Sequence, residues 1–513
     1  MSRSQLARVL AFAGIGAVAF ASMLWITRGG LGVSPDSIVY LSTAKNLLGG
    51  NGFFDRGHPM THYPPGYPML LAAVGFLNSG DVLNGARWLH AALFAYNVVL
   101  TGVAVMICTR RSLAAACIAM LFLLLSAPML AVHSMLWSEP PFIALTLTGF
   151  LLLTRHVAVP DRRVLLLGSS ALGLAISTRF VGVILIPILG MILLVASDRP
   201  VFARRRDAII GMALASLPLG AWILRNVATA NKLSDWKFSF HPADFGHVRA
   251  LLNTLHDFVL AVFVPDMWKV MEVAVALVLV GLGISYLSRR RYFSSKSADQ
   301  ATSLRITCAA YFVAYVTFVL FSISFLDART PLDDRILLPA LLLLLVAVIG
   351  LAWVVAREAQ NMLVWKATLF FLLLCTGINA KRAVAEAIDI RANGRAFNST
   401  AWRNSPTLSA LVKRYPSRTV YSNGEDAIWF RTARNSVSIP REVNPDTELP
   451  NGDYARDMVT MCEAIRSGEA VLVYLNGVNW RWYVPSAREI EAQCFMSTRE
   501  KFADGVIYST RVH

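Results

Sequence analysis

The sequence predicts a mainly α-helical protein, a polytopic bundle of about eleven transmembrane helices followed by a small α/β domain at the C-terminal end. Hydrophobic residues make up 56% of the 513 residues and charged residues only 16%, and the apolar residues fall in long uninterrupted runs. A run of roughly 17–25 apolar residues is long enough for a helix to cross the hydrocarbon core of a bilayer. After residue 380 these runs give way to short segments in which polar and apolar residues alternate.

The first run covers residues 6–27 and follows two basic residues, Arg3 and Arg8. Because it continues through Trp25 and many further runs follow it, we interpret it as an uncleaved first helix and not as a signal peptide. Ten further spans are predicted at residues 88–109, 112–132, 139–154, 163–178, 180–197, 208–225, 269–287, 304–325, 336–355 and 363–380. The apolar runs between residues 139 and 197 are short, so the number of spans could differ from eleven by one.

Arginines gather in every second loop between these runs, for example at Arg110, Arg155, Arg205 and Arg290. The positive-inside rule assigns such loops to the cytoplasm. The net charge of +16 is therefore interpreted as a topology signal, and no nucleic-acid partner is expected. With an odd number of spans, the N-terminus is cytoplasmic and the C-terminal domain extracytoplasmic, in the cell inner (plasma) membrane.

The predicted membrane domain, residues 1–380, has three outward segments, at residues 28–87, 225–269 and 326–335. The first contains a helix start at Ser34 to Ser37, an amphipathic stretch and a stop at Gly49-Gly50, which predict a helix lying along the membrane surface. A second short interfacial helix is predicted at residues 69–77, after the Pro64-Pro65 pair. These segments are where chemistry outside the cytoplasm is expected.

The tail, residues 381–513, is predicted to form the extracytoplasmic α/β domain. Its residue pattern predicts strands at 419–422, 471–474 and 506–509, and helices at 424–431 and 453–465. Two cysteines, Cys462 and Cys494, lie in this tail. Outside the cytoplasm they could form a disulfide, and two free thiols are the equal alternative.

The distribution of charge favours an enzyme that works at the membrane surface. The span interiors are nearly free of acidic residues, whereas a polytopic transporter or a lipid flippase for glycolipid export, the competing interpretation, usually carries charges within its spans and shows repeated halves. Transfer of a sugar from a lipid phosphate needs one carboxylate to take a proton and cations to hold the phosphate. In the outer segments Asp36 is the candidate carboxylate, and the candidate cations are His62, Lys45, Arg225, Arg249, Arg329 and Arg335.

A series of short motifs carries a family resemblance. The first outer segment reads Asp36-x-x-x-Tyr40 and then Tyr63-Pro64-Pro65-Gly66-Tyr67-Pro68; Ser138-Glu139-Pro140, Leu217-Pro218, Arg225-Asn226 and Arg335 to Pro339 follow. In this order they resemble the GT-C glycosyltransferases, in the branch of protein O-mannosyltransferases and the lipid A aminoarabinose transferase. The resemblance covers roughly residues 1–360, and the tail adds little to it.

The resemblance implies an inverting membrane glycosyltransferase, a hexosyl- or pentosyltransferase that takes its sugar from a polyprenyl-phosphate donor. It implies that Asp36 is the catalytic base and that Arg225 and Arg335 bind the donor phosphate, with His62 or Lys45 in place of a family lysine before the proline pair. Supporting residues are Tyr40, Tyr63, Pro64, Pro65, Tyr67, Glu139 and Arg179. The expected partners are membrane lipid, the donor, and a lipid-linked glycan, lipid A, a cell-wall glycan or a protein as acceptor.

Structural interpretations of the same residues stay open. Asp36 lies in the first turn of a helix, where an acidic residue favours the helix dipole without any catalytic task, and Glu139 could anchor the end of a span. Arg225 and Arg335 lie at span ends, where arginine commonly reaches the headgroups. Asp36, Asp55 and Asp81 share one segment but match no recognised metal-ligand spacing, so no metal site is predicted, and a requirement for a divalent cation (Mg or Mn) stays open.

Overall fold

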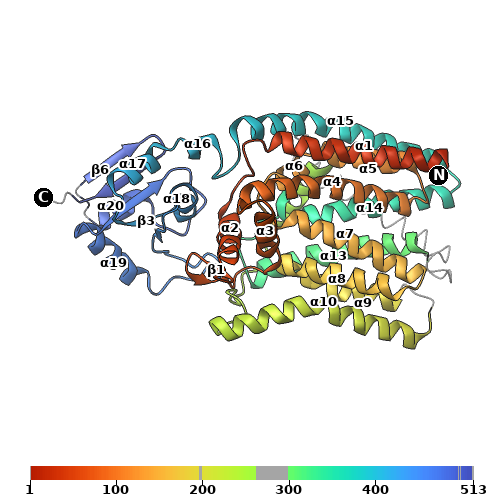
Figure 1. Cartoon of the computed structure of the whole chain (residues 1–513), viewed down its shortest axis with the longest axis horizontal. Coiled ribbons are helices and arrows are strands. Elements are labelled where there is room, and N and C mark those ends of the chain that lie inside the picture. Colours follow the sequence, from red (N-terminus) through yellow and green to blue (C-terminus); the bar gives the residue numbers. More distant parts are fainter. Residues whose placement is uncertain (1, 196–198, 261–298, 495, 497, 511–513) are drawn as a thin grey trace.

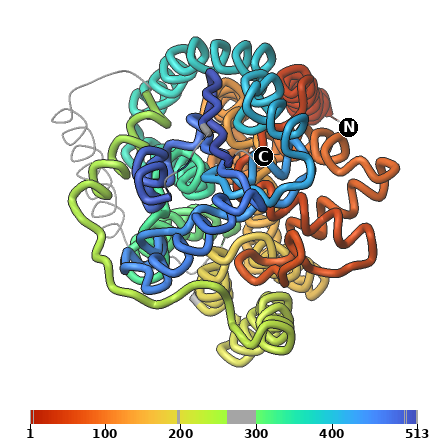
Figure 2. Tube along the Cα trace, turned by 90° about the vertical axis from the view of Figure 1, so that its left-hand side faces the viewer, coloured from red at the N-terminus to blue at the C-terminus, as the bar shows by residue number. Residues whose placement is uncertain are grey.

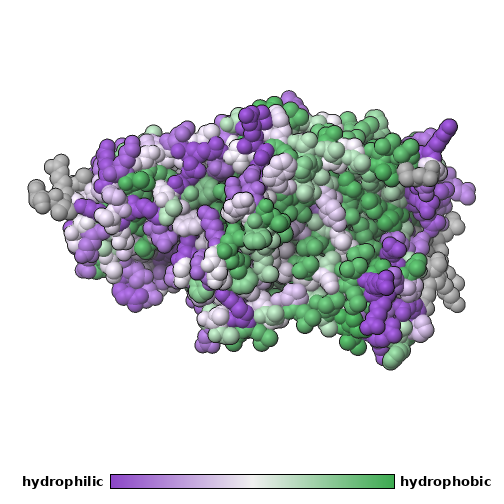
Figure 3. All heavy atoms as spheres, in the orientation of Figure 1, coloured by the Kyte–Doolittle hydropathy of each residue, from purple (hydrophilic) through white to green (hydrophobic). Residues whose placement is uncertain are grey.

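The computed structural model describes residues 2–195, 199–260, 299–494, 496 and 498–510. A helical bundle and a smaller sheet domain lie end to end along the long axis of the molecule (Figure 1). The N-terminus lies at the end of the bundle farthest from the sheet domain (Figure 1). Hydrophobic residues cover the visible face of the bundle, whereas hydrophilic residues dominate the sheet domain and the opposite end (Figure 3).

The bundle contains seven helices that are long and apolar enough to cross a membrane, by their length and composition, within the described ranges. They are α1 (Arg3–Ile26), α4 (Val82–Cys108), α7 (Glu139–Ala158), α10 (Val201–Ala230), α13 (Gln300–Phe325), α14 (Asp334–Glu358) and α15 (Met362–Asn393). At 1.5 Å of rise per residue, about 20 helical residues span the hydrocarbon core. The chain is therefore a multi-pass membrane protein.

Three further predicted spans are shorter or broken. The one expected at residues 112–132 consists of α5 (Leu113–Leu124) and α6 (Ala127–His133), which are bent by 61° relative to each other and raise the count to eight if they form one span. Pro128 in the first turn of α6 cannot continue the hydrogen-bond ladder of α5. Helix α8 (Arg162–Thr178), and η1 (Phe180–Ile184) with α9 (Leu185–Val195), are shorter than the seven spanning helices. The predicted span at 269–287 lies outside the described residues.

The first outer segment folds into the two helices that its sequence predicts, and a small hairpin that was not predicted joins them. Helix α2 (Pro35–Leu48) begins at Ser34, whose side chain exchanges hydrogen bonds with Ser37 in a capping box, and ends at Gly49. Strands β1 (Phe54–Asp55) and β2 (His58–Pro59) pair antiparallel, and α3 (Gly66–Leu77) follows. A Cβ atom on Gly66 would lie 2.6 Å from the carbonyl oxygen of Ser177, so only glycine lets α3 begin against the end of α8.

The second outer segment contains α11 (Phe245–Val259) within its described part. The boundary predicted at residue 380 falls inside α15, which continues to Asn393 before the chain enters the sheet domain. Figure 2, turned by 90°, shows the blue C-terminal domain in front of the ring of helices.

The C-terminal domain is built on a mixed sheet of five strands in the order β4-β3-β5-β7-β6. The strands are β3 (Thr419–Ser422), β4 (Val437–Ser438), β5 (Ala470–Leu475), β6 (Thr498–Phe502) and β7 (Gly505–Ser509); the helices are α16 (Thr400–Arg403), α17 (Pro406–Arg414), α18 (Glu425–Thr432), α19 (Tyr454–Arg466) and α20 (Ala487–Cys494). Strands β4, β3 and β5 run parallel, and β5, β7 and β6 antiparallel. The prediction of a small α/β domain is confirmed. A disulfide between Cys462 and Cys494 joins α19 to α20 across a sequence separation of 32.

Candidate functional site

A cavity of about 1320 Å³ lies between the helical bundle and the C-terminal domain. Its floor comes from α2, the loop before α3, and the ends of α7, α8, α13 and α14. Its roof comes from the C-terminal domain, through α18 and the segments around residues 441–448 and 480–483. The cavity therefore combines the predicted outer loops with a part of the tail.

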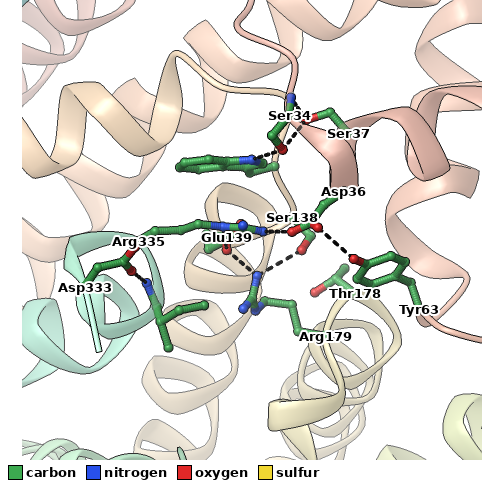
Figure 4. A network of polar contacts seen from close by, with 12 residues as sticks. Ser34, Asp36, Ser37, Tyr63, Ser138, Glu139, Thr178, Arg179, Asp333 and Arg335 are labelled. Atoms are coloured by element: carbon green, nitrogen blue, oxygen red, sulfur yellow. Dashed lines mark hydrogen bonds and ion pairs between the residues drawn. The ribbon is translucent and has the colours of Figure 1, made fainter. Parts of the chain in front are cut away.

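The floor holds a network of two carboxylates and two guanidiniums (Figure 4). Arg335 donates through Nη2 to Asp36 Oδ2 at 2.5 Å and through Nε to Glu139 Oε1 at 2.7 Å. The same Glu139 oxygen forms an ion pair with Arg179, which also donates to Ser138 Oγ at 3.2 Å. Residues up to 299 positions apart in sequence thus meet at one point.

Each member of this network occupies a helix end that its local sequence defines. Asp36 lies in the first turn of α2, after Pro35, and Glu139 is the first residue of α7. Arg335 lies in the first turn of α14, whose N-cap Asp333 accepts from the backbone N–H of Ile336 at 3.0 Å. Because these ends meet on the side of the bundle that faces the cavity, their side chains cluster there.

Charge is balanced inside the network. The Glu139 side chain is 0% exposed, and Arg179 and Arg335 are 14% and 19% exposed. A buried charge is tolerated only when it is paired, and here each carboxylate faces at least one guanidinium. Arg335 also lies over the ring of Trp137, at 4.2 Å from the centroid, which adds a cation–π contact.

Asp36 is the most accessible acidic member of the network, with 27% of its side chain exposed. Burial raises the pKa of Asp36, but the charge and hydrogen bond of Arg335 and the hydrogen bond from Tyr63 outweigh this effect and hold the pKa below its ordinary value. Tyr63 donates through its hydroxyl to Asp36 Oδ1 at 2.8 Å, and burial raises the pKa of Tyr63 so that the hydroxyl keeps its proton. Asp36 is thus an ionised acceptor whose two oxygens have free lone pairs.

The tyrosines predicted as supporting residues form an edge-to-face cluster next to Asp36. The ring of Tyr40 contacts those of Tyr63 and Tyr67 edge to face, at centroid distances of 4.9 and 5.0 Å. Tyr67 is fully buried, and its hydroxyl lies 2.8 Å from His90 Nε2. Of the proline pair, Pro64 lines the cavity and Pro65 is the N-cap of α3.

Two of the remaining predicted cations, His62 and Lys45, lie in different environments. His62 lines the cavity, with its ring 4.6 Å from the rings of both Tyr63 and Trp236. Lys45 is exposed in the last turn of α2, opposite to the end that carries Asp36, and its ammonium lies 5.3 Å from the ring of Trp429. The structure therefore brings His62 to the site and places Lys45 outside the cavity lining.

Arg225 does not reach the cavity lining. Its guanidinium donates to the carbonyl oxygens of Phe53 and Met60 at 2.8 and 2.6 Å and lies 4.7 Å from the ring of Trp222. These contacts hold the two ends of the β1–β2 hairpin against α10. The position of Arg225 fits a structural role in the first outer segment.

The roof of the cavity contains residues that the sequence analysis did not single out. Arg56, in the hairpin, donates to Asp426 Oδ1 at 2.8 Å and so ties the roof to the first outer segment. Within the roof, Arg481 donates to Asp426 Oδ2 at 2.7 Å. A second tie is the ion pair between Asp446 of the roof and Arg329, which was one of the candidate cations. The aromatic and basic run Trp480 to Tyr483 was the available sequence signal for this roof.

In the ranges that the structure describes, no group of three or more His, Cys, Asp or Glu side chains comes close enough to hold a metal ion. The three acids of the first outer segment have separate partners. Asp36 pairs with Arg335, Asp55 pairs with Arg56, and Asp81 caps α4 by accepting from the N–H of Asn84 at 3.0 Å.

No model of a known protein family matches the chain, and no curated protein matches its sequence. Solved structures do match. ArnT from Cupriavidus metallidurans bound to undecaprenyl phosphate is 14% identical, with 99% of this chain and 98% of that chain covered and a TM-score of 0.55. The apo state of the same protein is also 14% identical, with 98% of this chain and 98% of that chain covered and a TM-score of 0.55. The apo oligosaccharyltransferase from Archaeoglobus fulgidus is 12% identical, with coverages of 90% and 69% and a TM-score of 0.51.

Proposed function

We propose that this chain, which has the fold of the GT-C glycosyltransferases, is a membrane glycosyltransferase that moves a sugar from a polyprenyl-phosphate donor to an acceptor. One observation carries the proposal, the network on the floor of a large cavity in which Arg335 pairs with Asp36 and Glu139 joins Arg335 to Arg179. A carboxylate beside guanidiniums is what sugar transfer from a lipid phosphate requires.

Arg335 is the proposed ligand of the donor phosphate, with Arg179 behind it. Both guanidiniums face carboxylates in the structure, so an incoming phosphate competes with Asp36 for Arg335. Glu139 continues to pair with Arg179 and Arg335 during this exchange and holds both side chains in position. Guanidinium binds phosphate oxygens in bidentate geometry, which suits this exchange. His62 lies within the same lining and is the next candidate. Arg225 is left out of the phosphate site because backbone carbonyls occupy its guanidinium.

Asp36 is the proposed general base. Once Arg335 turns to the phosphate, Asp36 accepts a hydrogen bond from an acceptor hydroxyl and takes its proton as the acceptor oxygen bonds to the anomeric carbon. The bond from that carbon to the phosphate oxygen breaks, and the phosphate leaves as an anion held by Arg335. Attack from the side opposite the phosphate inverts the configuration at the anomeric carbon.

The proposed topology places the N-terminus in the cytoplasm and the cavity with the C-terminal domain outside, in the inner membrane. The N-terminus and the C-terminal domain lie at opposite ends of the bundle, which supports an odd number of crossings (Figure 1). Eleven crossings need α5–α6, α8 and the η1–α9 stretch to count as spans, together with one in residues outside the described ranges.

The test is transfer of radiolabelled sugar from a polyprenyl-phosphate donor by the purified chain in liposomes, with the envelope glycans of the producing cell as acceptors. Asp36→Asn should abolish transfer. Asp81→Asn is the matched control, since Asp81 shares the same segment but only caps α4, and asparagine caps as well as aspartate. Equal transfer by wild type and Asp36→Asn would remove Asp36 from the reaction. A lipid flippase would instead move labelled lipid across the bilayer without forming a glycosylated product.

A further inference from the structure

We propose that the roof of the cavity is a subsite for the acceptor and that it binds a neutral oligosaccharide. The inference rests on the proposed function, because it concerns the acceptor of the same reaction. It commits to one class among the acceptors that the sequence leaves open, a glycan without phosphate groups.

Two tryptophans of the roof carry the first argument. Trp480 and Trp482 line the cavity, yet 48% and 58% of their surfaces are exposed. They are the large aromatic side chains most exposed in the described part of the C-terminal domain. A tryptophan buries a large apolar area when a flat ligand packs on it, and its N–H stays available for a hydrogen bond. One face of a pyranose ring consists mainly of C–H groups, which makes a sugar such a ligand.

The tryptophan pair is held in place by the buried residues that alternate with it. Arg481, between the two, is 7% exposed at its side chain and forms ion pairs with Glu425 and Asp426 of α18. Tyr483 is buried to 6% exposure and lies under the guanidinium of Arg441 at 5.5 Å from its centroid. The rings have neighbours of their own, since that of Trp480 lies 6.3 Å from the ring of Phe397 and that of Trp482 lies 5.9 Å from the ring of Tyr483. Rings whose freedom is already limited lose less entropy when a ligand binds.

The charge of the cavity lining favours a neutral saccharide over a phosphorylated one. The described lining carries eight carboxylates and six arginines, so it offers no excess of positive charge. Most of the arginines already face acids, as Arg329 faces Asp446 and Arg481 faces Glu425. The donor phosphate needs the cations of the floor, so an acceptor that brings further phosphates has few guanidiniums left. A neutral glycan instead donates its hydroxyls to carboxylates, which accept only.

The roof and Asp36 face one continuous cavity. A volume of about 1320 Å³ exceeds the range of roughly 300–1,000 Å³ that single small-molecule sites occupy. The cavity therefore has room for a donor sugar over Asp36 together with acceptor sugars under the tryptophans. A saccharide held by Trp480 and Trp482 would present its end hydroxyl toward the floor.

The test uses the full chain in lipid nanodiscs on an array of defined neutral oligosaccharides, their phosphorylated forms and peptides. Trp480→Ala and Trp482→Ala should each weaken binding of neutral oligosaccharides on the order of ten-fold, as expected for truncation of a central aromatic contact. Trp480→Phe and Trp482→Phe keep a ring and should recover most of this loss. Val459→Ala is the control, because Val459 is 55% exposed on α19 and lies outside the cavity lining.

Three results would overturn the subsite: binding to peptides or phosphorylated glycans only, binding to neutral glycans that both alanine variants leave unchanged, and no binding to any probe. The array needs no transfer, so it separates the two proposals. Glycan binding that depends on the tryptophans, in a protein that transfers no sugar, keeps the subsite and refutes the transferase. Transfer that depends on Asp36, with an acceptor KM unchanged in the tryptophan variants, keeps the transferase and refutes the subsite.

Discussion

Glu139→Gln removes the carboxylate that holds both guanidiniums of the floor. Glu139 is fully buried and pairs with Arg179 and Arg335, which are only 14% and 19% exposed. Removal of one partner of a buried ion pair costs about 3–5 kcal/mol, because it leaves charge without compensation in a poorly solvated place. At about 2 °C for each kcal/mol in a large domain, the melting temperature should fall by roughly 6–10 °C.

The assay is thermal melting of the detergent-solubilised protein, with transfer measured below the transition. Asp453→Asn is the matched control, since Asp453 pairs with Arg456 at 3.0 Å and the two side chains are 62% and 72% exposed. Loss of such an exposed pair costs about 0–1 kcal/mol, so this control should melt within about 2 °C of wild type. Transfer by Glu139→Gln should fall as well, because Arg335 loses one of its two anchors.

The double variant Glu139→Gln/Arg179→Gln separates charge balance from lost packing. Removing Arg179 as well restores balance between Asp36 and Arg335, so the double variant should melt above the Glu139→Gln single variant. The reasoning fails if Glu139→Gln melts with wild type, or if the double variant loses the sum of the two single effects. Either outcome would mean that the network does not depend on buried charge pairing.

Three further results are expected. The pKa of Asp36 lies below its ordinary value of 3.8, so its ion pair stabilises the fold above that pH and is lost as the pH falls through the lowered pKa. The acid limb of kcat/KM, which reports the protein without bound donor, should therefore lie below about pH 4. Tyr63→Phe removes a hydrogen bond that lowers this pKa and should move the limb to higher pH, with Arg335 left in place. Replacing Cys462 and Cys494 by Ser should destabilise the C-terminal domain by about 2–5 kcal/mol in chemical unfolding, and a reductant should reproduce this only in wild type. Arg225→Met should speed proteolysis at residues 53–60 and leave the affinity for polyprenyl phosphate unchanged, whereas a weaker affinity would return Arg225 to the phosphate site.

Features set by local sequence could be predicted. Helix α2 was expected from Ser34-Pro35 and the Gly49-Gly50 stop, and strands β3, β5 and β7 from short apolar alternations, and all of them form. Each of these signals acts within a few residues of the element that it defines. The two-residue strand β4 and the charged strand β6 carried no such pattern and were missed.

Features set by tertiary packing could not be predicted from the chain alone. Asp36, Glu139, Arg179 and Arg335 were each candidates, but sequence does not show that Glu139 joins both arginines. The family resemblance implied that Arg225 binds the donor phosphate, and only the fold shows its bonds to the hairpin carbonyls.

Hydropathy alone missed two more features. The bend of 61° between α5 and α6 interrupts a predicted span at Ser126 and Pro128, a local signal that a count of apolar residues does not register. No residue of the tail was a candidate for the site, yet Trp480 and Trp482 reach the cavity from more than 440 residues after Asp36 in the chain. Contacts between segments so far apart in the chain produce no local residue pattern from which they could be predicted.

The most direct test of the central claim is a density map of the protein in lipid nanodiscs with polyprenyl phosphate added. We expect a phosphate within about 3 Å of the guanidinium of Arg335 or Arg179, beside Asp36, with the polyprenyl chain leaving the cavity between helices. A phosphate seated instead at Arg110 and Arg111, at the end of the bundle that carries the N-terminus, would contradict it (Figure 1).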